Sequence, residues 1–523
     1  MSSNSEPIMQ QLQHDFKELL ALVSGPEAFT HSAYSIESRL FRGLLALGKA
    51  LLHLFFITRA AEPLRAPMLE TSGKTLRYHE KRPRDYYSVF GKLTFARPYY
   101  YLKGEAGVCP LDAKLSLPKR CYSDLLREWA TCGATEGSFR DSASLLQRIL
   151  SLPLSLQAVE TMSAEDAVDV QTFYDSKLLS SPPASPAALP APEDAASVSA
   201  APGSLLVVQA DGKGVPMVQS PLESSPARLG KGEKRGTKKE AIVTTLYTVA
   251  PYVRTPQEVL AALLREQPES DEAKQDKTAS SKADRPRPVD KELRATLDGK
   301  ATAIGRLSAQ AAAREQETIT AKVALSDGAE ALQQQILTHL PGYTLVLDII
   351  HAGEYLWDTA NALLGEKHSG RLGWLSRQLG AVLSGDTQGV ISGLQQELEK
   401  PDCSETQRKA FTRTIGYYQR NLPYMRYDHY LAQGWPIGTG VVEGACAHLV
   451  KDRMEQSGMR WTKAGAQAVL DLRSVRLSGH WDAYWQFHRE QQHHRLYGSS
   501  PATVPCNAGA EDTPETQMFR LAA

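Results

Sequence analysis

The chain has 523 residues, too many for a single hydrophobic core, so we expect about two to four domains. Its composition, with 42% hydrophobic and 23% charged residues, excludes a disordered or fibrous protein. Lys plus Arg and Asp plus Glu both number 59, and this zero net charge excludes a uniformly basic nucleic-acid binder while permitting a local basic surface.

The N-terminal part of the chain is typical of a soluble intracellular protein. Apolar residues recur at helical spacing over residues 10–60, and the N-terminus lacks the basic start and apolar core of a secretory signal. The most apolar run, Leu44 to Phe56, carries Lys49 and His53 and is shorter than the roughly 20 residues of a membrane span. We interpret it as a buried helix and expect no membrane partner. The six cysteines form no CxxC pair, which favours reduced thiols over disulfides or a zinc site.

The pattern changes to strands from Leu76 to Leu102. Two aromatic and β-branched runs, 86–90 and 93–97, flank Gly91-Lys92 and predict a β-hairpin with a two-residue turn. Helical spacing returns over 123–177 in three pieces, with breaks at 133–135 and 152–153. These short helices are typical either of a helix-turn-helix ending in 155–162 or of a plain helical bundle or dimerisation domain, and pattern alone does not separate the two.

Two stretches have the composition of linkers. Residues 180–203 repeat Pro, Ala and Ser without periodicity, and residues 266–290 are dense in charged residues, Ser and Pro. Because strand and helix signals resume after the second stretch, we expect it to interrupt a domain rather than to end one.

The remainder of the chain predicts an α/β sheet with an all-helical insertion. Expected strands lie at 205–210, 240–249, 318–325 and 343–350, and expected helices at 292–315, 329–340 and 439–477. Strands followed by alternating helices and strands indicate a sheet with parallel members. The segment 354–433 is helical throughout and separates the last strand from the last helix.

These patterns predict six parts of the chain. They are an N-terminal helical region (1–75), a hairpin and helical region that is a candidate for DNA binding (76–179), a linker (180–203), a sheet domain (204–353 with 434–480), the helical insertion (354–433) and a C-terminal tail (481–523).

Three acidic residues stand out by position. Asp211 follows the first expected strand, Asp327 follows the third, and Glu443 opens the helix after a glycine-rich segment. An Asp-Gly dipeptide at a strand end is common turn chemistry, so each aspartate alone is more simply a turn residue. Together, however, they can converge at one rim of an α/β sheet. Clustered carboxylates need cations to stay ionised, and two Mg²⁺ ions about 4 Å apart would bind such a group and a phosphodiester.

A second pair of polar residues follows the strongest expected strand. Asp348 and His351 are three residues apart, so they can hydrogen-bond to each other or brace the carboxylate group. Two alternatives stay open from the residues alone: Asp348 can itself be a catalytic carboxylate, and His351 can be a capping or core residue.

Several segments resemble a known family. They are 211–212 (Asp-Gly), 326–330 (Ser-Asp-Gly-Ala-Glu), 347–352 (Leu-Asp-Ile-Ile-His-Ala), 434–444 (Gly-Trp-Pro-Ile-Gly-Thr-Gly-Val-Val-Glu-Gly) and 450–461 (Val-Lys-Asp-Arg-Met-Glu-Gln-Ser-Gly-Met-Arg-Trp). Over residues 85–490 the chain is similar to ISKra-type bacterial insertion-sequence transposases. These belong to the DDE group, which is close to the Mutator-like elements and has a ribonuclease-H-like catalytic core.

The resemblance implies a ribonuclease-H-like mixed sheet and a catalytic triad of Asp211, Asp327 and Glu443. It implies two Mg²⁺ (or Mn²⁺) ions, with Asp211 bridging them and the other two residues each holding one. Asp348 and His351 match a D-x-x-H signature and become supporting residues. The implied reaction is phosphodiester hydrolysis at the element ends, followed by attack of the freed 3′-hydroxyl on target DNA.

The implied partners are the terminal inverted repeats and target DNA, bound by a homodimer or higher homo-oligomer in the cytoplasm at the nucleoid. Two other functions remain possible: a nuclease or resolvase that cuts without strand transfer, and a catalytically dead descendant that binds DNA.

Basic residues in two places are candidates for DNA contact through phosphates or bases. The first group comprises Arg228, Lys231, Lys234, Arg235, Lys238 and Lys239, and the second comprises Lys451, Arg453, Arg460 and Trp461. A solvated loop is the alternative for the first group, and capping and packing of a helix is the alternative for the second.

Overall fold

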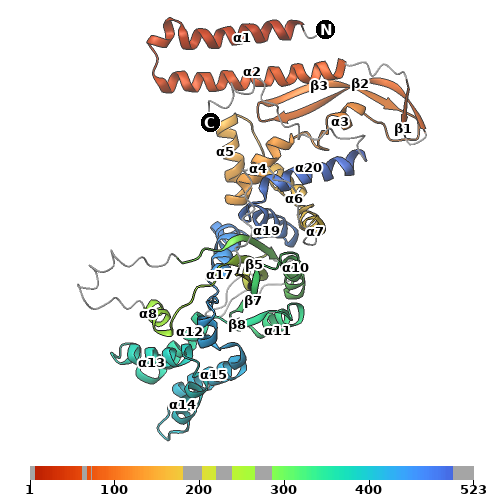
Figure 1. Ribbon diagram of the computed structural model, residues 1–523. Coiled ribbons are helices and arrows are strands. Elements are labelled where there is room, and N and C mark those ends of the chain that lie inside the picture. The colour runs from red at the N-terminus through yellow and green to blue at the C-terminus, as the bar shows by residue number, and fades with distance from the viewer. Residues whose placement is uncertain are drawn as a thin grey trace, which may run out of the picture. The chain divides into compact units, whose positions relative to one another are not determined.

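The computed structural model describes residues 6–61, 68–71, 74–180, 203–218, 238–264 and 285–498 (Figure 1). The chain divides into two compact units. Unit 1 consists of Met1–Gly133, Phe139–Met162 and Trp485–Ala523, and unit 2 consists of Ala134–Ser138 and Ser163–Tyr484. Both units therefore join segments that are remote in the sequence.

Unit 1 begins with two packed helices, α1 (Glu6–Ser24) and α2 (Ala33–Ala61), as the apolar spacing predicted. Gly43 marks their close approach, because a Cβ atom at this position would lie 2.3 Å from the side chain of Leu19. Leu12 and Leu22 are buried in α1.

The prediction that the apolar run of α2 is buried is wrong. Phe56 is buried, but Leu44, Leu51 and Phe55 keep about half of their surface exposed. The reason is that α2 packs mainly along α1 and one strand, so much of its circumference stays uncovered in the described part of the chain. The run also belongs to a longer helix, whose segment Ala33–Ala60 is long and apolar enough to cross a membrane, and little of its most apolar part is buried.

The predicted β-hairpin is present in unit 1. Strand β2 (Lys74–Ser88) pairs antiparallel with β3 (Gly91–Tyr101), and a further strand, β1 (Met68–Thr71), pairs with β2. The turn, however, lies at Val89-Phe90 rather than at Gly91-Lys92, because Ser88 pairs with Gly91. The Ser88 hydroxyl stabilises this turn by accepting from the Phe90 N–H and donating to the Gly91 carbonyl.

Short helices follow the hairpin. They are α3 (Pro110–Lys114), α4 (Asp124–Glu136), α5 (Phe139–Leu150), α6 (Leu156–Asp166) and α7 (Val170–Ser180). The break predicted at 152–153 is confirmed, whereas α4 continues through 133–135 and a further break occurs at 167–169. Gly133 stays helical, and its missing side chain leaves room for Ser142 of α5.

The predicted C-terminal tail begins with a helix, α20 (Trp481–Tyr497). Its later residues belong to unit 1, where Gln492 donates to Asp124 at 3.0 Å and the Tyr497 hydroxyl donates to the Leu117 carbonyl at 2.6 Å. These partners are more than 350 residues away along the chain, so sequence pattern does not reveal them.

Unit 2 contains a five-stranded mixed sheet of order β6-β5-β4-β7-β8. The strands are β4 (Ser204–Pro216), β5 (Lys238–Val249), β6 (Val289–Thr296), β7 (Ile319–Ser326) and β8 (Thr344–Leu347). Strands β4, β7 and β8 run parallel, while β5 is antiparallel to both of its neighbours. This order and these directions confirm the ribonuclease-H-like fold class.

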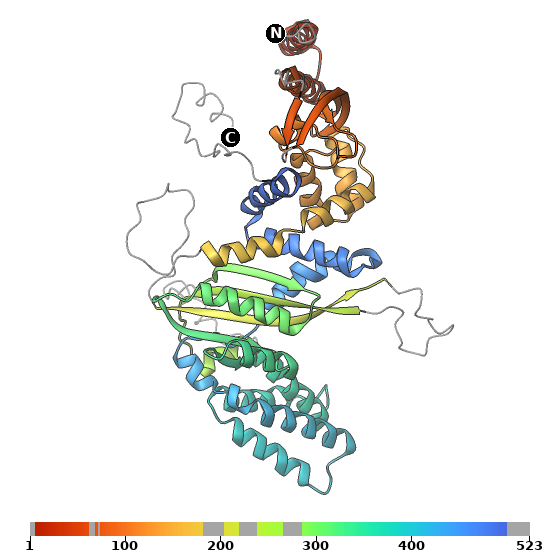
Figure 2. The ribbon, with the colours of Figure 1, turned by 90° about the vertical axis from the view of Figure 1, so that its right-hand side faces the viewer.

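Helices cover both faces of this sheet (Figure 2). Leu206 and Val208 pack against α10 (Lys300–Ala313) and α11 (Glu330–His339), and the alternate residues Leu205 and Val207 share a core with the helical insertion. Successive strand residues point to opposite faces, so a strand buried on both sides is apolar throughout. The sequence Leu-Leu-Val-Val of β4 shows this pattern.

One predicted helix is partly wrong. Residues 292–315 were expected to be helical, but Val289–Thr296 form β6 and the helix α10 begins at Lys300. The sequence of β6 has few β-branched residues, and tertiary pairing overrides its weak strand propensity. Its buried carboxylate, Glu292, accepts hydrogen bonds from Gln310 and Arg314.

The helical insertion between β8 and the last helices is confirmed. It comprises α12 (Ile349–Leu364), α13 (Arg371–Leu383), α14 (Thr387–Glu399), α15 (Glu405–Asn421) and α16 (Tyr427–Ala432). A short helix before it, α8 (Pro256–Leu264), packs against α13. Helix α17 (Gly440–Ala445), one π-helical turn (Cys446–Lys451), α18 (Asp452–Met454) and α19 (Lys463–Leu477) follow.

Candidate functional site

The strand register places three aspartates at one edge of the sheet of unit 2. Gln209 of β4 pairs with Leu325 of β7, so Asp211 and Asp327 each lie two residues beyond a paired position. Ser326 of β7 pairs with Leu347 of β8, and Asp327 and Asp348 each follow directly. Because β4, β7 and β8 are parallel neighbours, their carboxyl ends share an edge, which is where α/β sheets bind ligands.

Asp211 lies within β4 rather than after it, because the strand continues to Pro216. One carboxylate oxygen accepts from the Gly212 N–H at 2.6 Å, and the other lies 3.3 Å from the Cys446 thiol, which donates to it. Burial raises the pKa of the Cys446 thiol, and the negative charges of Asp211 and Glu443 raise it further. The thiol therefore stays protonated and lies near both carboxylates.

Asp327 begins the turn between β7 and α11. Its Oδ1 accepts from the Ala329 N–H at 2.8 Å. The insertion braces this turn, since the Tyr417 hydroxyl donates to the Asp327 carbonyl and Arg420 donates to the Gly328 carbonyl, both at 2.8 Å. Gly328 has φ +90°, and a Cβ atom there would lie 2.5 Å from the Tyr417 hydroxyl, so this turn requires glycine.

Asp348 caps a helix instead of ending a long strand. The strand predicted at 343–350 stops at Leu347, and Asp348 is the N-cap of α12, accepting from the Ile350 N–H at 3.1 Å. Its side chain is fully buried and accepts from His351 Nδ1 at 2.6 Å and from the Thr439 hydroxyl at 2.8 Å. These bonds occupy both oxygens of Asp348, which fits a supporting role.

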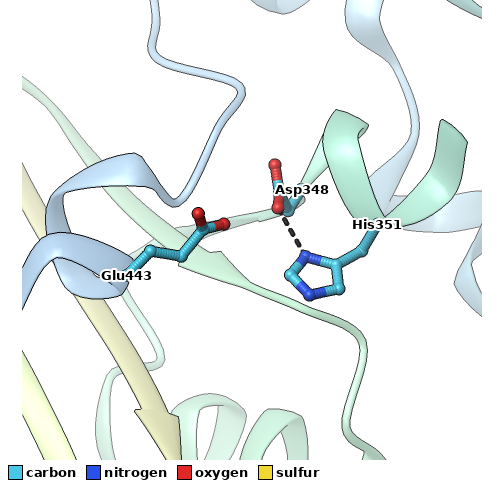
Figure 3. A group of neighbouring side chains, drawn as sticks. All are labelled: Asp348, His351 and Glu443. Atoms are coloured by element: carbon cyan, nitrogen blue, oxygen red, sulfur yellow. Dashed lines mark hydrogen bonds and ion pairs between the residues drawn. The ribbon is translucent and has the colours of Figure 1, made fainter. Parts of the chain in front are cut away.

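Glu443 reaches the same place from α17. Figure 3 shows its carboxylate directed toward Asp348 and His351, which come from the opposite side. The Thr439 hydroxyl lies 3.0 Å from Glu443 Oε1 as well as 2.8 Å from Asp348 Oδ2. Since a hydroxyl has one proton, it donates to one of these carboxylates at a time and couples their positions.

His351 carries a positive charge in this environment. The hydrogen bond to Asp348 is the largest cause that raises the pKa of His351 to about 9, and the charges of Asp348, Glu354 and Asp327 add to it. A protonated imidazole cannot bind a metal, so a cation would first have to displace its proton. We therefore interpret His351 as a cationic partner of the carboxylates.

The distances between the carboxylates of the site determine whether they can bind one metal ion or two. In the described part of the chain, one group of potential ligand atoms lies within 4.8 Å of one another, and it consists of Asp348, His351 and Glu443. Asp211 and Asp327 lie outside this group, so the predicted triad does not meet at that spacing. A two-ion site does not require it to, because the two ions are themselves about 4 Å apart.

The donor set of the predicted triad fits Mg²⁺ or Mn²⁺. Asp211, Asp327 and Glu443 supply oxygen atoms, which these hard cations prefer. Glu443 is exposed and the two aspartates are partly exposed, so their oxygens are accessible to ions and to a phosphodiester.

The structure separates the predicted DNA-contact residues into three sets. Arg228, Lys231, Lys234 and Arg235 lie outside the described residues. Lys238, Lys239, Lys451 and Arg460 are exposed, and Lys238 pairs with Glu455 at 2.5 Å. Arg453 and Trp461 are buried.

Arg453 and Trp461 serve in packing, which is the alternative to DNA contact. Arg453 is 0% exposed, donates from Nε to the Ala134 carbonyl and lies 4.8 Å from the centre of the Trp461 ring. Trp461 Nε1 donates to the Met454 carbonyl at 3.0 Å. Neither side chain is accessible to DNA in this structure, so we remove both from the contact set.

Sequence reasoning missed three residues of the site. Gln209 is a polar residue in an otherwise apolar strand, and this signal could have revealed it. Its amide donates to the Tyr247 hydroxyl and accepts from the Val442 N–H, both at 2.9 Å, which links β4 to the residue before Glu443. Thr439 and Cys446 lie four residues before and three after Glu443, a spacing that places them on its side of the helix.

The charge on His351 predicts a pH-dependent stability. Its pKa of about 9 in the folded chain exceeds the ordinary value of 6.5, so the stabilisation is complete below pH 6.5 and is lost as the pH rises through 9. Because the side chain is 33% exposed, we expect a screened loss of about 1–2 kcal/mol. Urea unfolding from pH 6 to 10 should show this loss in the wild type and not in His351→Gln; equal profiles would contradict it.

Comparisons with known proteins identify no relative of the chain. No protein-family model matches the chain, and no curated protein sequence matches it.

Proposed function

We propose that the chain is a DDE transposase of the ISKra type, which cuts and joins DNA at insertion-sequence ends. The observation that carries this proposal is that Asp211 and Asp327 each lie two residues beyond the last paired position of two adjacent parallel strands, with Glu443 approaching the same edge from a helix. The strand order and the position of the helical insertion before Glu443 support it.

The residues have distinct roles in this proposal. Asp211, Asp327 and Glu443 would hold two Mg²⁺ or Mn²⁺ ions, which when bound polarise the phosphodiester and stabilise the leaving oxygen. Asp348 and Thr439 hold Glu443 in place, and His351 balances the negative charge of the buried Asp348. Cys446 orients Asp211 through its thiol hydrogen bond.

DNA is the partner that we propose, with terminal repeats and target DNA as substrates. The exposed cations Lys239, Lys451 and Arg460 are suited to sequence-independent phosphate contacts. We also propose that the protein acts in the cytoplasm, at the nucleoid where its substrate lies. The helix-turn-helix hypothesis for 123–177 stays a prediction.

An assay with two readouts tests the proposed function. The full chain is incubated with Mg²⁺, labelled DNA of the candidate element ends and a target plasmid, and both nicked and joined products are measured. We expect both products with Mg²⁺ or Mn²⁺ and neither with EDTA. Nicks without joining would identify a nuclease or resolvase, and shifted but intact DNA would identify a DNA-binding descendant.

We further propose that α1 and α2 mediate self-association with a second copy of the chain. Each helix exposes an apolar stripe with helical spacing. The residues are Phe16, Leu20 and Val23 of α1 and Phe41, Leu44, Leu51 and Phe55 of α2, exposed by 43–53%. At roughly 200 Å² per side chain they present about 600 Å² in total, so a symmetric pair would bury about 1,200 Å², the lower end of specific interfaces.

Replacing two residues of the stripe tests this association. We expect Leu44→Glu/Leu51→Glu to weaken self-association at least about tenfold, because each buried charge opposes burial of the stripe. Analytical ultracentrifugation measures the effect, with Lys49→Glu as a charge control on the same helix. A monomeric wild type that floats with liposomes would instead indicate a membrane partner for α2.

A further inference from the structure

Unit 2 contains a cavity of about 530 Å³ that the proposed reaction does not use. Its walls are the segment after β5, the segment before β6 and the loop that leads into α17. The residues that matter here are Tyr247, Tyr252, Arg254, Arg285, Arg287 and Gly440. A volume of this size accommodates a small organic ligand such as a nucleotide.

The cavity has a cationic lining. Arg254, Arg285 and Arg287 contribute to it, and no carboxylate lines it among the residues that the structure describes. Burial lowers the pKa of Arg254, and the neighbouring Arg285 cation lowers it further, so these two guanidinium groups are close enough to repel each other. An anion between them would relieve this repulsion.

The wall beside these arginines is held firmly by hydrogen bonds. The Tyr252 N–H donates to the Gly434 carbonyl at 2.8 Å, and Arg254 Nη2 donates to the Trp435 carbonyl at 2.6 Å. Gly434 has φ +71°, and a Cβ atom there would lie 2.5 Å from the Tyr252 nitrogen, so the close approach requires glycine. The backbone of Tyr252 is therefore held in place, and its side chain lines the cavity.

The cavity is connected to the candidate active site through β4. Tyr247, which lines the cavity, accepts a hydrogen bond from Gln209 at 2.9 Å, and Gln209 accepts from the Val442 N–H at 2.9 Å. Val442 directly precedes Glu443, and Gly440 and Val441 themselves line the cavity. A ligand bound here would thus lie against the first turn of the helix that carries Glu443.

We infer that this cavity binds one nucleotide of single-stranded DNA, with its phosphate at Arg254, Arg285 and Arg287 and its base on the ring of Tyr252. Arginine and an aromatic ring are the groups by which proteins hold an unpaired nucleotide without reading its sequence. An intact duplex presents its phosphates but not its base faces, so a cavity with a ring fits the unpaired strand. The inference rests on the proposed function, because cutting at a DNA end supplies such a strand.

Binding of labelled oligonucleotides to the full chain tests the inference. Fluorescence anisotropy is measured in EDTA with a 15-nucleotide single strand and a 30-base-pair duplex, so that no cutting occurs. We expect Arg285→Ala/Arg287→Ala to weaken single-strand binding about tenfold and to lower its log–log salt slope by about 0.7, which is the contribution of the one phosphate that these arginines contact. Duplex affinity should change less than about twofold.

The contribution of the aromatic ring is tested separately. Tyr252→Ala should weaken single-strand binding about tenfold, while Tyr252→Phe keeps the stacking surface and should bind like the wild type. The matched control for charge is Arg408→Ala/Arg413→Ala, which removes two exposed arginines from α15 and should leave single-strand affinity unchanged.

Two results would overturn the inference. The first is that both Arg285→Ala/Arg287→Ala and Tyr252→Ala bind the single strand as tightly as the wild type does. The second is that the arginine substitutions weaken duplex and single-strand binding equally, which would place the arginines on duplex phosphates. Failure of the proposed function is distinguishable, because it appears as absent Mg²⁺-dependent cutting by the wild type whatever the anisotropy shows.

Discussion

Asp211→Asn is expected to lower DNA cutting at least about 10³-fold while leaving DNA affinity within about twofold. The amide has the shape of the carboxylate but lacks its negative charge, so it binds a divalent cation poorly. Asp211 also lies inside β4, where its backbone is paired with β5, and the substitution leaves that pairing intact. We therefore expect the substitution to lower the rate of cutting without unfolding the protein.

Cutting is measured with Mg²⁺ and end-labelled DNA, and affinity by anisotropy in EDTA. The matched control is Asp358→Asn, which neutralises an exposed aspartate of α12 whose partner is Arg413 at 3.2 Å. We expect this control to cut like the wild type. If Asp211→Asn still cuts DNA, Asp211 is not part of the catalytic triad. The proposed function would then lose its main support, which is the strand register that places Asp211 beside Asp327.

Asp348→Ala is expected to destabilise unit 2 by about 2–4 kcal/mol, because it removes a fully buried carboxylate that caps α12 and pairs with the partly exposed His351. The Asp348 side chain is 0% exposed and accepts from His351, Ile350 and Thr439. Without the carboxylate, His351 loses the partner that keeps it charged and the N-terminus of α12 loses its cap. Asp348→Asn keeps a side-chain oxygen that can cap α12 and keeps the side-chain volume, so we expect a smaller loss of stability than for Asp348→Ala.

Urea unfolding followed by tryptophan fluorescence measures this loss. Asp358→Ala serves as the control on the same helix, and because its ion pair is exposed we expect a change within about 0.5 kcal/mol. A loss for Asp348→Ala no greater than that of the control would mean that the network around Asp348 contributes nothing to stability. In that case the alternative that Asp348 is itself a catalytic carboxylate would be favoured over a supporting role.

The differences between the predicted and observed elements have identifiable causes. Residues 292–296 have a helical composition but complete the sheet beside β5, since pairing and buried ion partners outweigh local preference. The predicted strand 343–350 included Asp348 and Ile349 because apolar residues lie on both sides of Asp348, yet the Asp348 side chain caps a helix there. Both errors arise because a local pattern does not include the partner that decides the conformation.

Much of the fold was predictable from the order of residues alone. Apolar runs that are buried on both faces identify β4, β5 and β7, and helical spacing identifies α1, α2, α11 and the insertion, because side-chain periodicity is a local property of each element. The positions of Asp327 directly after β7 and of Glu443 near the start of α17 were likewise visible in the sequence, whereas the continuation of β4 past Asp211 was not.

Only the tertiary structure decided what those residues contact. It buried Arg453 and Trp461, left the apolar stripe of α2 exposed, joined α20 to unit 1, and linked Glu443 to Asp348 through Thr439. Each of these outcomes depends on which surfaces meet across long sequence separations. Periodicity specifies that an element has an apolar face, whereas strand register and packing determine its neighbour.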